Sequence, residues 1–156
     1  MKPGDNLKKS VAERVTISMV STFRIRMAPP DIHKIQYEGQ LYATGDGWYI
    51  KFVEPGEEGT TNTTLKMKED EITVIRHGAV TMRHSYRKGV KTAGSYIGPA
   101  GAMHMETDTR DVRYKNDEQG WLSSCAWSYD LYLNEQKIGR YELECSIARE
   151  VNKILH

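Results

Sequence analysis

The sequence of 156 residues has little cysteine and almost no net charge. Its two cysteines, Cys125 and Cys145, are too few for a disulfide framework, and they lack the CxxC spacing that zinc and redox sites use. With 22 Lys and Arg residues against 21 Asp and Glu residues, the net charge of +1 gives no electrostatic case for nucleic acid or an anionic membrane as a partner. We therefore expect neither.

Long apolar runs are also missing. No stretch approaches the roughly 20 apolar residues of a transmembrane helix. Residues 1–13 carry lysines but no apolar run of the kind found in signal peptides. These absences favour a cytoplasmic protein, and the length is that of one domain with a single core.

Local motifs of known chemistry are absent as well. No spacing of His, Asp and Glu suggests a metal site, no glycine-rich phosphate loop precedes a helix, and no serine or cysteine has an identifiable triad partner. We therefore predict no catalytic residues, no metal and no cofactor. An enzyme is the third alternative, because barrels can host chemistry that spacing does not reveal.

What the chain does have is an apolar alternation of period two along most of its length. The pattern predicts about ten strands joined by short turns, with the first four near residues 15–26, 32–43, 48–53 and 61–68. Such a meander must close or split into two layers. We predict an all-β fold, a single antiparallel up-and-down β-barrel of about 8–10 strands, with a two-sheet sandwich as the alternative. The barrel is expected over residues 14–148, after a flexible segment 1–13 and before a short tail or helix 149–156.

Residues 71–86 are the centre of this pattern and predict a hairpin with a loop at 76–78 that ends at Gly78. The turns at 69–70, 87–89 and 98–101 then predict the pairing of the neighbouring strands. In this register Ile72 faces Met67 and Met82, and Gly94 faces Met82 and Met105. One face of five strands is therefore apolar, and it includes Ile72, Val74, Val80, Met82, Tyr96, Met103 and Met105.

The segment 76–82, followed by Gly89 and residues 101–107, resembles the YwiB-like family of small bacterial proteins. The residues that match its motif are Arg76, Gly78, Ala79, Val80 and Met82. The resemblance extends from about Val15 to Ile147 and implies a lipocalin-like (calycin) β-barrel. It implies no catalytic residues.

A ligand site is predicted inside the barrel. A barrel of about eight strands is either filled by its own side chains or leaves room for one small molecule. Methionines on the inner face adapt to varied apolar ligands, and Gly94 makes room between them unless larger neighbours close over it. The aromatic residues are either cavity walls with polar tips or plain core. The predicted ligand-binding residues are Met82, His84, Tyr86, Gly94, Tyr96, Met103, Met105, Trp127 and Arg76.

Three polar or reactive positions have two interpretations each. His84 is either a hydrogen-bonding group of the cavity, titrating near pH 6.5 if unperturbed, or a histidine satisfied by Thr92 on the next strand. Arg76 either holds an anion at the barrel mouth or is a solvated charge. Cys125 and Cys145 lie opposite each other if the loop falls at residues 134–136, and a reducing compartment favours free thiols.

The leading functional hypothesis is a barrel that binds a small, largely apolar molecule in its interior. The alternative is a filled barrel that acts as a protein-interaction or assembly module, including with a second copy in a homodimer. Apolar residues on the nominally polar face, namely Tyr49, Val53, Ile75 and Ile97, favour that alternative.

Overall fold

The computed structural model describes residues 12–150 as ten β-strands with no helix among them. The strands are β1 (Ala12–Arg24), β2 (Asp31–Ala43), β3 (Trp48–Glu54), β4 (Thr61–Lys68), β5 (Glu71–Gly78), β6 (Thr81–Arg87), β7 (Lys91–Gly98), β8 (Gly101–Asn116), β9 (Leu122–Leu133) and β10 (Gln136–Arg149). This part of the chain accordingly contains no helix that could cross a membrane.

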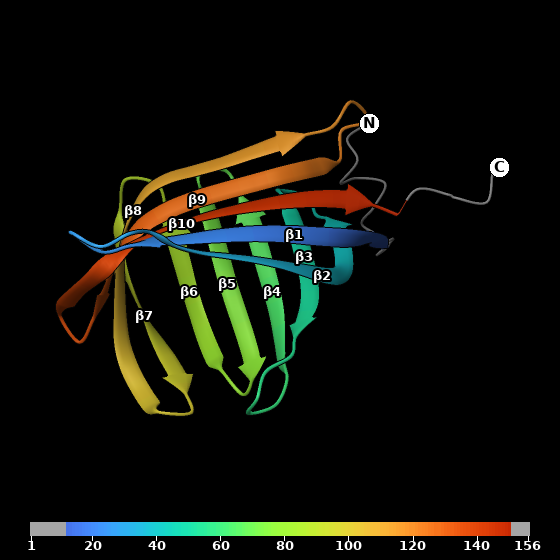
Figure 1. The fold of residues 1–156 in the computed structure, drawn as a ribbon. Helices are drawn as coiled ribbons and strands as arrows, with labels where there is room; N and C mark the ends of the chain where they lie inside the picture. The colour runs from blue at the N-terminus through green and yellow to red at the C-terminus, as the bar shows by residue number, and fades with distance from the viewer. Residues whose placement is uncertain (1–11, 151–156) are drawn as a thin grey trace.

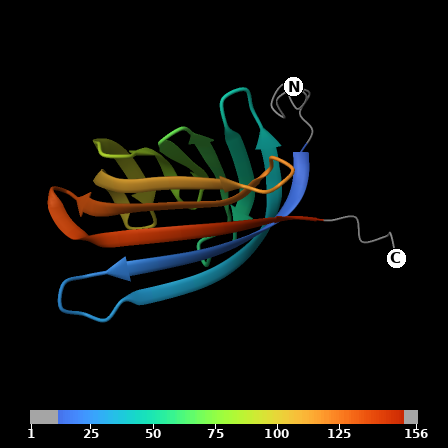
Figure 2. The same cartoon turned by 90° about the horizontal axis from the view of Figure 1, so that it is seen from above.

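Each strand pairs antiparallel with its neighbours in sequence, and β1 also pairs with β10, which closes the ring. Figure 1 shows β4, β5 and β6 running across the direction of β1, β9 and β10, and Figure 2 places these two sets of strands on opposite sides of the molecule. The predicted up-and-down barrel is confirmed, and the sandwich is excluded.

The predicted boundaries differ slightly from the strands. β1 begins at Ala12, two residues before the predicted start of the barrel, and β10 ends at Arg149. Arg149 therefore belongs to a strand and not to the predicted tail or helix. Residues 1–11 of the predicted flexible segment and residues 151–156 of the tail lie outside the described residues.

Two of the four predicted registers are correct. β4 pairs with β5 through Lys68 and Glu71, and β7 pairs with β8 through Gly98 and Gly101. On the far side, Cys125 lies directly opposite Cys145 as predicted, and both thiols are free and buried. The loop between the two strands, residues 134–135, is one residue shorter than predicted, and a bulge between Lys137 and Gly139 takes up the difference.

The register of the central hairpin was wrong by four residues. Ile72 faces Tyr86 rather than Met82, and Arg76 faces Met82. Gly78, which was predicted to close the hairpin loop, is a glycine for another reason. Gly78 has a φ of +140°, and a Cβ built on it would lie 2.3 Å from the carbonyl oxygen of Thr60, so the glycine admits the backbone entering β4. An even shift leaves every side chain on its predicted face.

The next pair, β6 and β7, is shifted by two residues, so that Met82 faces Tyr96 instead of Gly94. The predicted loop at 87–89 forms a turn, in which the amide of Val90 donates to the carbonyl of Arg87, and this turn is also bonded to other segments. The amide of Lys88 donates to the carbonyl of Asp70, and the amide of Gly89 donates to the carbonyl of Thr109. These bonds to other segments anchor the turn in addition to its own hydrogen bond.

The barrel is packed at one end and hollow at the other. At the closed end, near the β2–β3 and β4–β5 turns, the interior is filled by apolar side chains that are at most 5% exposed, including Val15, Leu41, Ile50, Leu65, Ile72 and Leu122. At the open end, near the β3–β4, β5–β6 and β7–β8 hairpins, the inward side chains are only partly buried, among them Val80, Tyr96 and Met103. The predicted apolar face therefore points inward throughout.

Candidate functional site in the open end of the barrel

A cavity of about 740 Å³ occupies the open half of the barrel. Four methionines from three strands line it: Met19, Met82, Met103 and Met105. Leucines of β9 and β10 continue the wall, namely Leu131, Leu133 and Leu143. Most of this surface offers no hydrogen bond, so it suits an apolar molecule.

Tyrosines form a second part of the wall. The ring centroid of Tyr129 lies 4.5 Å from that of Tyr86 and 5.6 Å from that of Tyr141. Burial raises the pKa of Tyr86 to about 12, and burial also raises the pKa of Tyr129 and of Tyr141. These phenols stay protonated at physiological pH and present rings with neutral polar tips.

One ion pair stands in this cavity. Nε of Arg76 donates to Oε2 of Glu54 at 3.0 Å, and the two side chains are 30% and 24% exposed. Glu54 also accepts hydrogen bonds from the hydroxyls of Thr63 and Tyr37. Burial, together with the neighbouring Glu54, raises the pKa of Tyr37 to about 12, so that Tyr37 remains a donor.

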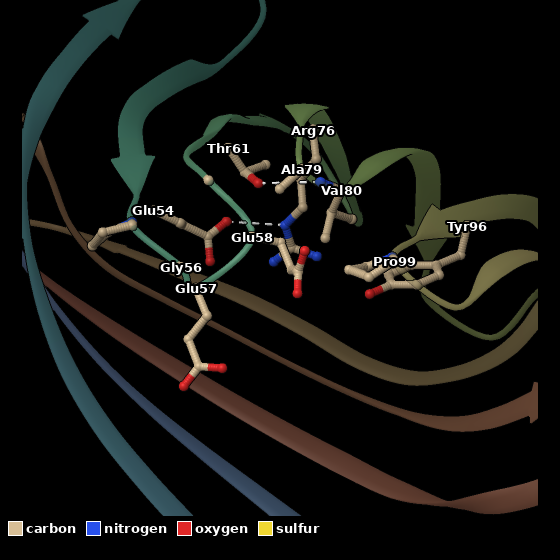
Figure 3. Close-up of a pocket in the computed structure, with 12 residues that line it drawn as sticks. Glu54, Gly56, Glu57, Glu58, Thr61, Arg76, Ala79, Val80, Tyr96 and Pro99 are labelled. Carbon is tan, nitrogen blue, oxygen red and sulfur yellow. Dashed lines mark hydrogen bonds and ion pairs between the residues drawn. The ribbon is translucent and has the colours of Figure 1, made fainter.

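The same ion pair borders a smaller outer cavity of about 460 Å³ beneath the β3–β4 loop. Figure 3 shows Glu54 and Arg76 pointing toward each other across this pocket, with Tyr96 and Pro99 on its far side. Arg76, Glu54 and Tyr96 line both cavities. The pair therefore stands where the outer pocket meets the inner cavity.

The barrel wall is open beside the cavity. β2 pairs with β3 only from Gly39 to Ala43, and no described strand pairs with residues 31–38 on that side. His33 and Ile35 from this exposed stretch line the cavity. The cavity therefore borders this unpaired edge.

Six of the predicted site residues line the inner cavity: Met82, Tyr86, Tyr96, Met103, Met105 and Arg76. The other three do not. Trp127 packs at 4% exposure in the core, with its ring centroid 6.3 Å from that of Tyr86. Gly94 and His84 lie against each other beside the cavity rather than on its wall.

His84 is a buried histidine with hydroxyl partners. It is 2% exposed, and its Nε2 lies 2.6 Å from Oγ1 of Thr107 and 3.3 Å from Oγ1 of Thr92. Its Nδ1 has no hydrogen-bond partner among the described residues. Burial lowers its pKa to about 4. The partner Thr92 was predicted, whereas the closer partner Thr107 was not.

The room that Gly94 makes is therefore filled by the protein itself. A Cβ built on Gly94 would lie 2.4 Å from Nδ1 of His84. The prediction that Gly94 opens space for a ligand was wrong, because the imidazole takes that space.

Sequence reasoning missed the residues that give the cavity its polarity. Glu54 fell just outside the strand predicted at residues 48–53, Tyr37 lay within the strand predicted at 32–43, and no site role was predicted for Tyr129 or Tyr141. A signal for Glu54 did exist, since it continues the inward parity of Ile50 and Phe52. A carboxylate on an inward position predicts a buried partner.

Comparison with known proteins agrees with this fold. Residues 17–145 match the model of a family described as a domain of unknown function, DUF1934. The chain belongs to the DUF1934 family. This DUF1934 chain is similar to the uncharacterized β-barrel protein YwiB of Bacillus subtilis strain 168, at 25% identity over 107 residues, which are 69% of this chain and 74% of that protein.

The crystal structure of the YwiB protein from Bacillus subtilis is also similar to the DUF1934 barrel described here. The TM-score is 0.70 at 19% identity, and the match covers 86% of this chain and 92% of that one. At this identity the likeness concerns the fold alone, and the predicted family resemblance is confirmed.

Proposed function

We propose that this barrel binds one small, largely apolar molecule in the cavity at its open end. The observation that carries the proposal is a hollow of about 740 Å³ whose wall is methionine, leucine and tyrosine, with a single ion pair inside. Ligand pockets typically measure about 300–1,000 Å³ and combine apolar walls with a few placed polar groups. Methionine side chains adapt to ligands of varied shape.

A fluorescent probe tests this proposal. N-phenyl-1-naphthylamine is neutral and emits strongly in apolar surroundings, so titration should give saturable binding with about one molecule per chain. Met103→Trp places a larger side chain in the cavity and should abolish the signal. Met27→Trp makes the same change at a position that is 96% exposed and should leave binding unchanged. Equal binding by both variants would refute an interior site.

Native mass spectrometry of the untagged protein purified from its own host gives an independent test. A reproducible mass excess that is lost on denaturation would support an occupied interior and begin to identify the molecule. A bare mass alone is not decisive, because weak ligands are lost in purification. A bare mass together with no binding of the probe would reject the proposal.

A second candidate function is protein interaction at the β1–β2 hairpin. Ile25, Met27 and Ile32 are 49%, 96% and 53% exposed, and residues 31–38 of β2 form an unpaired edge. An exposed edge strand with apolar side chains is a template for pairing with another chain. Light scattering should then give a homodimer that Ile32→Lys converts to a monomer. A wild-type monomer at all concentrations would dismiss this homodimer.

A further inference from the structure

The hydrogen bonds of the Glu54–Arg76 pair are unequally satisfied. Glu54 accepts from three donors: Thr63, Tyr37 and Nε of Arg76. The guanidinium of Arg76 has five N–H donors. Only two are used within the described residues, one toward Glu54 and one toward the thioether sulfur of Met82 at 3.4 Å. Sulfur is a weak acceptor, so the site has donors to spare and few acceptors to fill them.

These spare donors belong to a group that lines both cavities. A partly buried donor without an acceptor is unfavourable once water is displaced. A ligand that fills the cavity must therefore bring an acceptor of its own to Arg76, or binding loses the solvation of the guanidinium.

The charge of that acceptor is limited by its neighbours. Glu54 already neutralises Arg76 at 3.0 Å, so a second carboxylate at the guanidinium would be repelled by Glu54 about as strongly as Arg76 attracts it. Glu57 and Glu58 line the outer pocket and add negative charge at the mouth. His33 and Lys34 line the cavity from an exposed stretch of β2, where solvent screens them.

We propose that the site selects an apolar molecule whose polar group is a neutral carbonyl, which accepts a hydrogen bond from the free guanidinium donors of Arg76. This inference rests on the proposed function. In it, Glu54 has a positioning role: it orients the guanidinium and cancels its charge, and thereby disfavours anions. Tyr37 and Thr63 hold the Glu54 carboxylate in place.

Competition for bound N-phenyl-1-naphthylamine at pH 8 tests the head group with three molecules of similar length: methyl octanoate, octanoate and nonane. Glu54→Gln keeps the shape and the acceptor oxygen but removes the negative charge. It should shift the ratio of ester to octanoate affinity at least tenfold toward octanoate. The double variant Glu54→Gln/Arg76→Met removes the donor without leaving a lone charge, and should reduce the ester affinity about fivefold relative to nonane.

The three molecules differ in water solubility, and this difference affects their affinities for every variant equally. It therefore cancels when the affinity ratio of two molecules is compared between one variant and the wild type. Unchanged ratios in both variants would overturn the carbonyl inference and leave the proposed function standing. Failure of all three molecules to displace the probe from wild-type protein, or no binding of the probe together with a bare mass in native mass spectrometry, would overturn the proposed function itself.

A measurement on wild-type protein covers the case in which the variants do not fold. The ester carbonyl stretch of methyl octanoate labelled with ¹³C at that carbon is compared between the bound state and a hexane solution. A shift to lower frequency reports a hydrogen bond to the carbonyl and supports the inference. An unshifted band contradicts it.

Discussion

Gly94 and His84 are packed so closely that only a glycine fits. They lie on adjacent strands, and a Cβ built on Gly94 would approach Nδ1 of His84 to 2.4 Å and the backbone carbonyl oxygen of Arg83 to 3.0 Å. The imidazole cannot easily move away, since Thr107 and Thr92 hold its other nitrogen and Tyr86 contacts its ring edge-on at a centroid distance of 4.7 Å. The glycine is therefore a requirement of the core.

We predict that Gly94→Ala lowers the free energy of unfolding by about 2 kcal/mol, because overpacking a rigid core forces side chains and backbone apart. Gly45→Ala is the control, since a Cβ there meets nothing within 4 Å. Urea denaturation followed by tryptophan fluorescence measures both. A cost for Gly94→Ala no larger than that for Gly45→Ala would show that the contact with His84 is soft.

The buried imidazole also makes stability depend on pH. Burial lowers the pKa of His84 to about 4, whereas an unfolded histidine has a pKa of about 6.5, so acid favours the unfolded state. The stabilisation that depends on a neutral His84 is fully present above about pH 6.5. It decreases as the pH falls to about 4, and it does not change further below that pH. Between pH 7.5 and 4.5 we expect a loss of about 2–3 kcal/mol from this residue.

Urea denaturation at the two pH values checks this prediction. His84→Gln should remove that part of the pH dependence, whatever its own cost in stability. His77→Gln alters an exposed histidine and should keep the wild-type dependence. If His84→Gln and wild type lose the same free energy between pH 7.5 and 4.5, the imidazole is not the group that titrates.

Asp130 is a buried charge on the outer face of the barrel. Its side chain is 4% exposed and accepts hydrogen bonds from Arg110 and Arg140, with Nζ of Lys137 at 3.9 Å. Although burial opposes ionisation, the bonds from Arg140 and Arg110 hold the pKa of Asp130 below its usual value. We predict that Asp130→Asn lowers the free energy of unfolding by about 2 kcal/mol, since bonds to charged groups are the strong ones.

Asp111→Asn is the matched control for this change. Asp111 also pairs with two cations, Lys88 and Arg113, but its side chain is 34% exposed, so we expect a loss of at most about 1 kcal/mol. Thermal melts at low and high salt compare the two variants. A stability of Asp130→Asn equal to that of Asp111→Asn would mean that burial adds nothing to the cluster.

The strands and their faces could be predicted from this sequence because period-two alternation is a local property. The packing of the turns could not. Gly78 serves a close approach to Thr60, and the turn at Gly89 is also bonded to Asp70 and Thr109, which are distant in sequence, whereas local turn rules assigned both glycines to loop closure alone. Whether the barrel interior is filled or hollow also depends on where the strands diverge, which the alternation does not show. Met67 and Met103 share the inward parity, yet Met67 is 1% exposed in the core and Met103 lines the cavity.

The last prediction tests which side chains of β5 and β6 face the barrel interior. Val74 is 3% exposed in the barrel core, and Thr81 points outward and is exposed. Val74→Asp buries a charge with no partner and should prevent folding. The cost of an unpaired buried carboxylate exceeds the free energy of unfolding of a typical domain. Thr81→Asp should fold with a change within about 0.5 kcal/mol. Circular dichroism and urea denaturation distinguish the two.

Val80 is a poorer position for this test, since it is half-buried and lines the outer pocket, where water can reach a new carboxylate. Similar stability of Val74→Asp and Thr81→Asp would be incompatible with the assigned faces of β5 and β6.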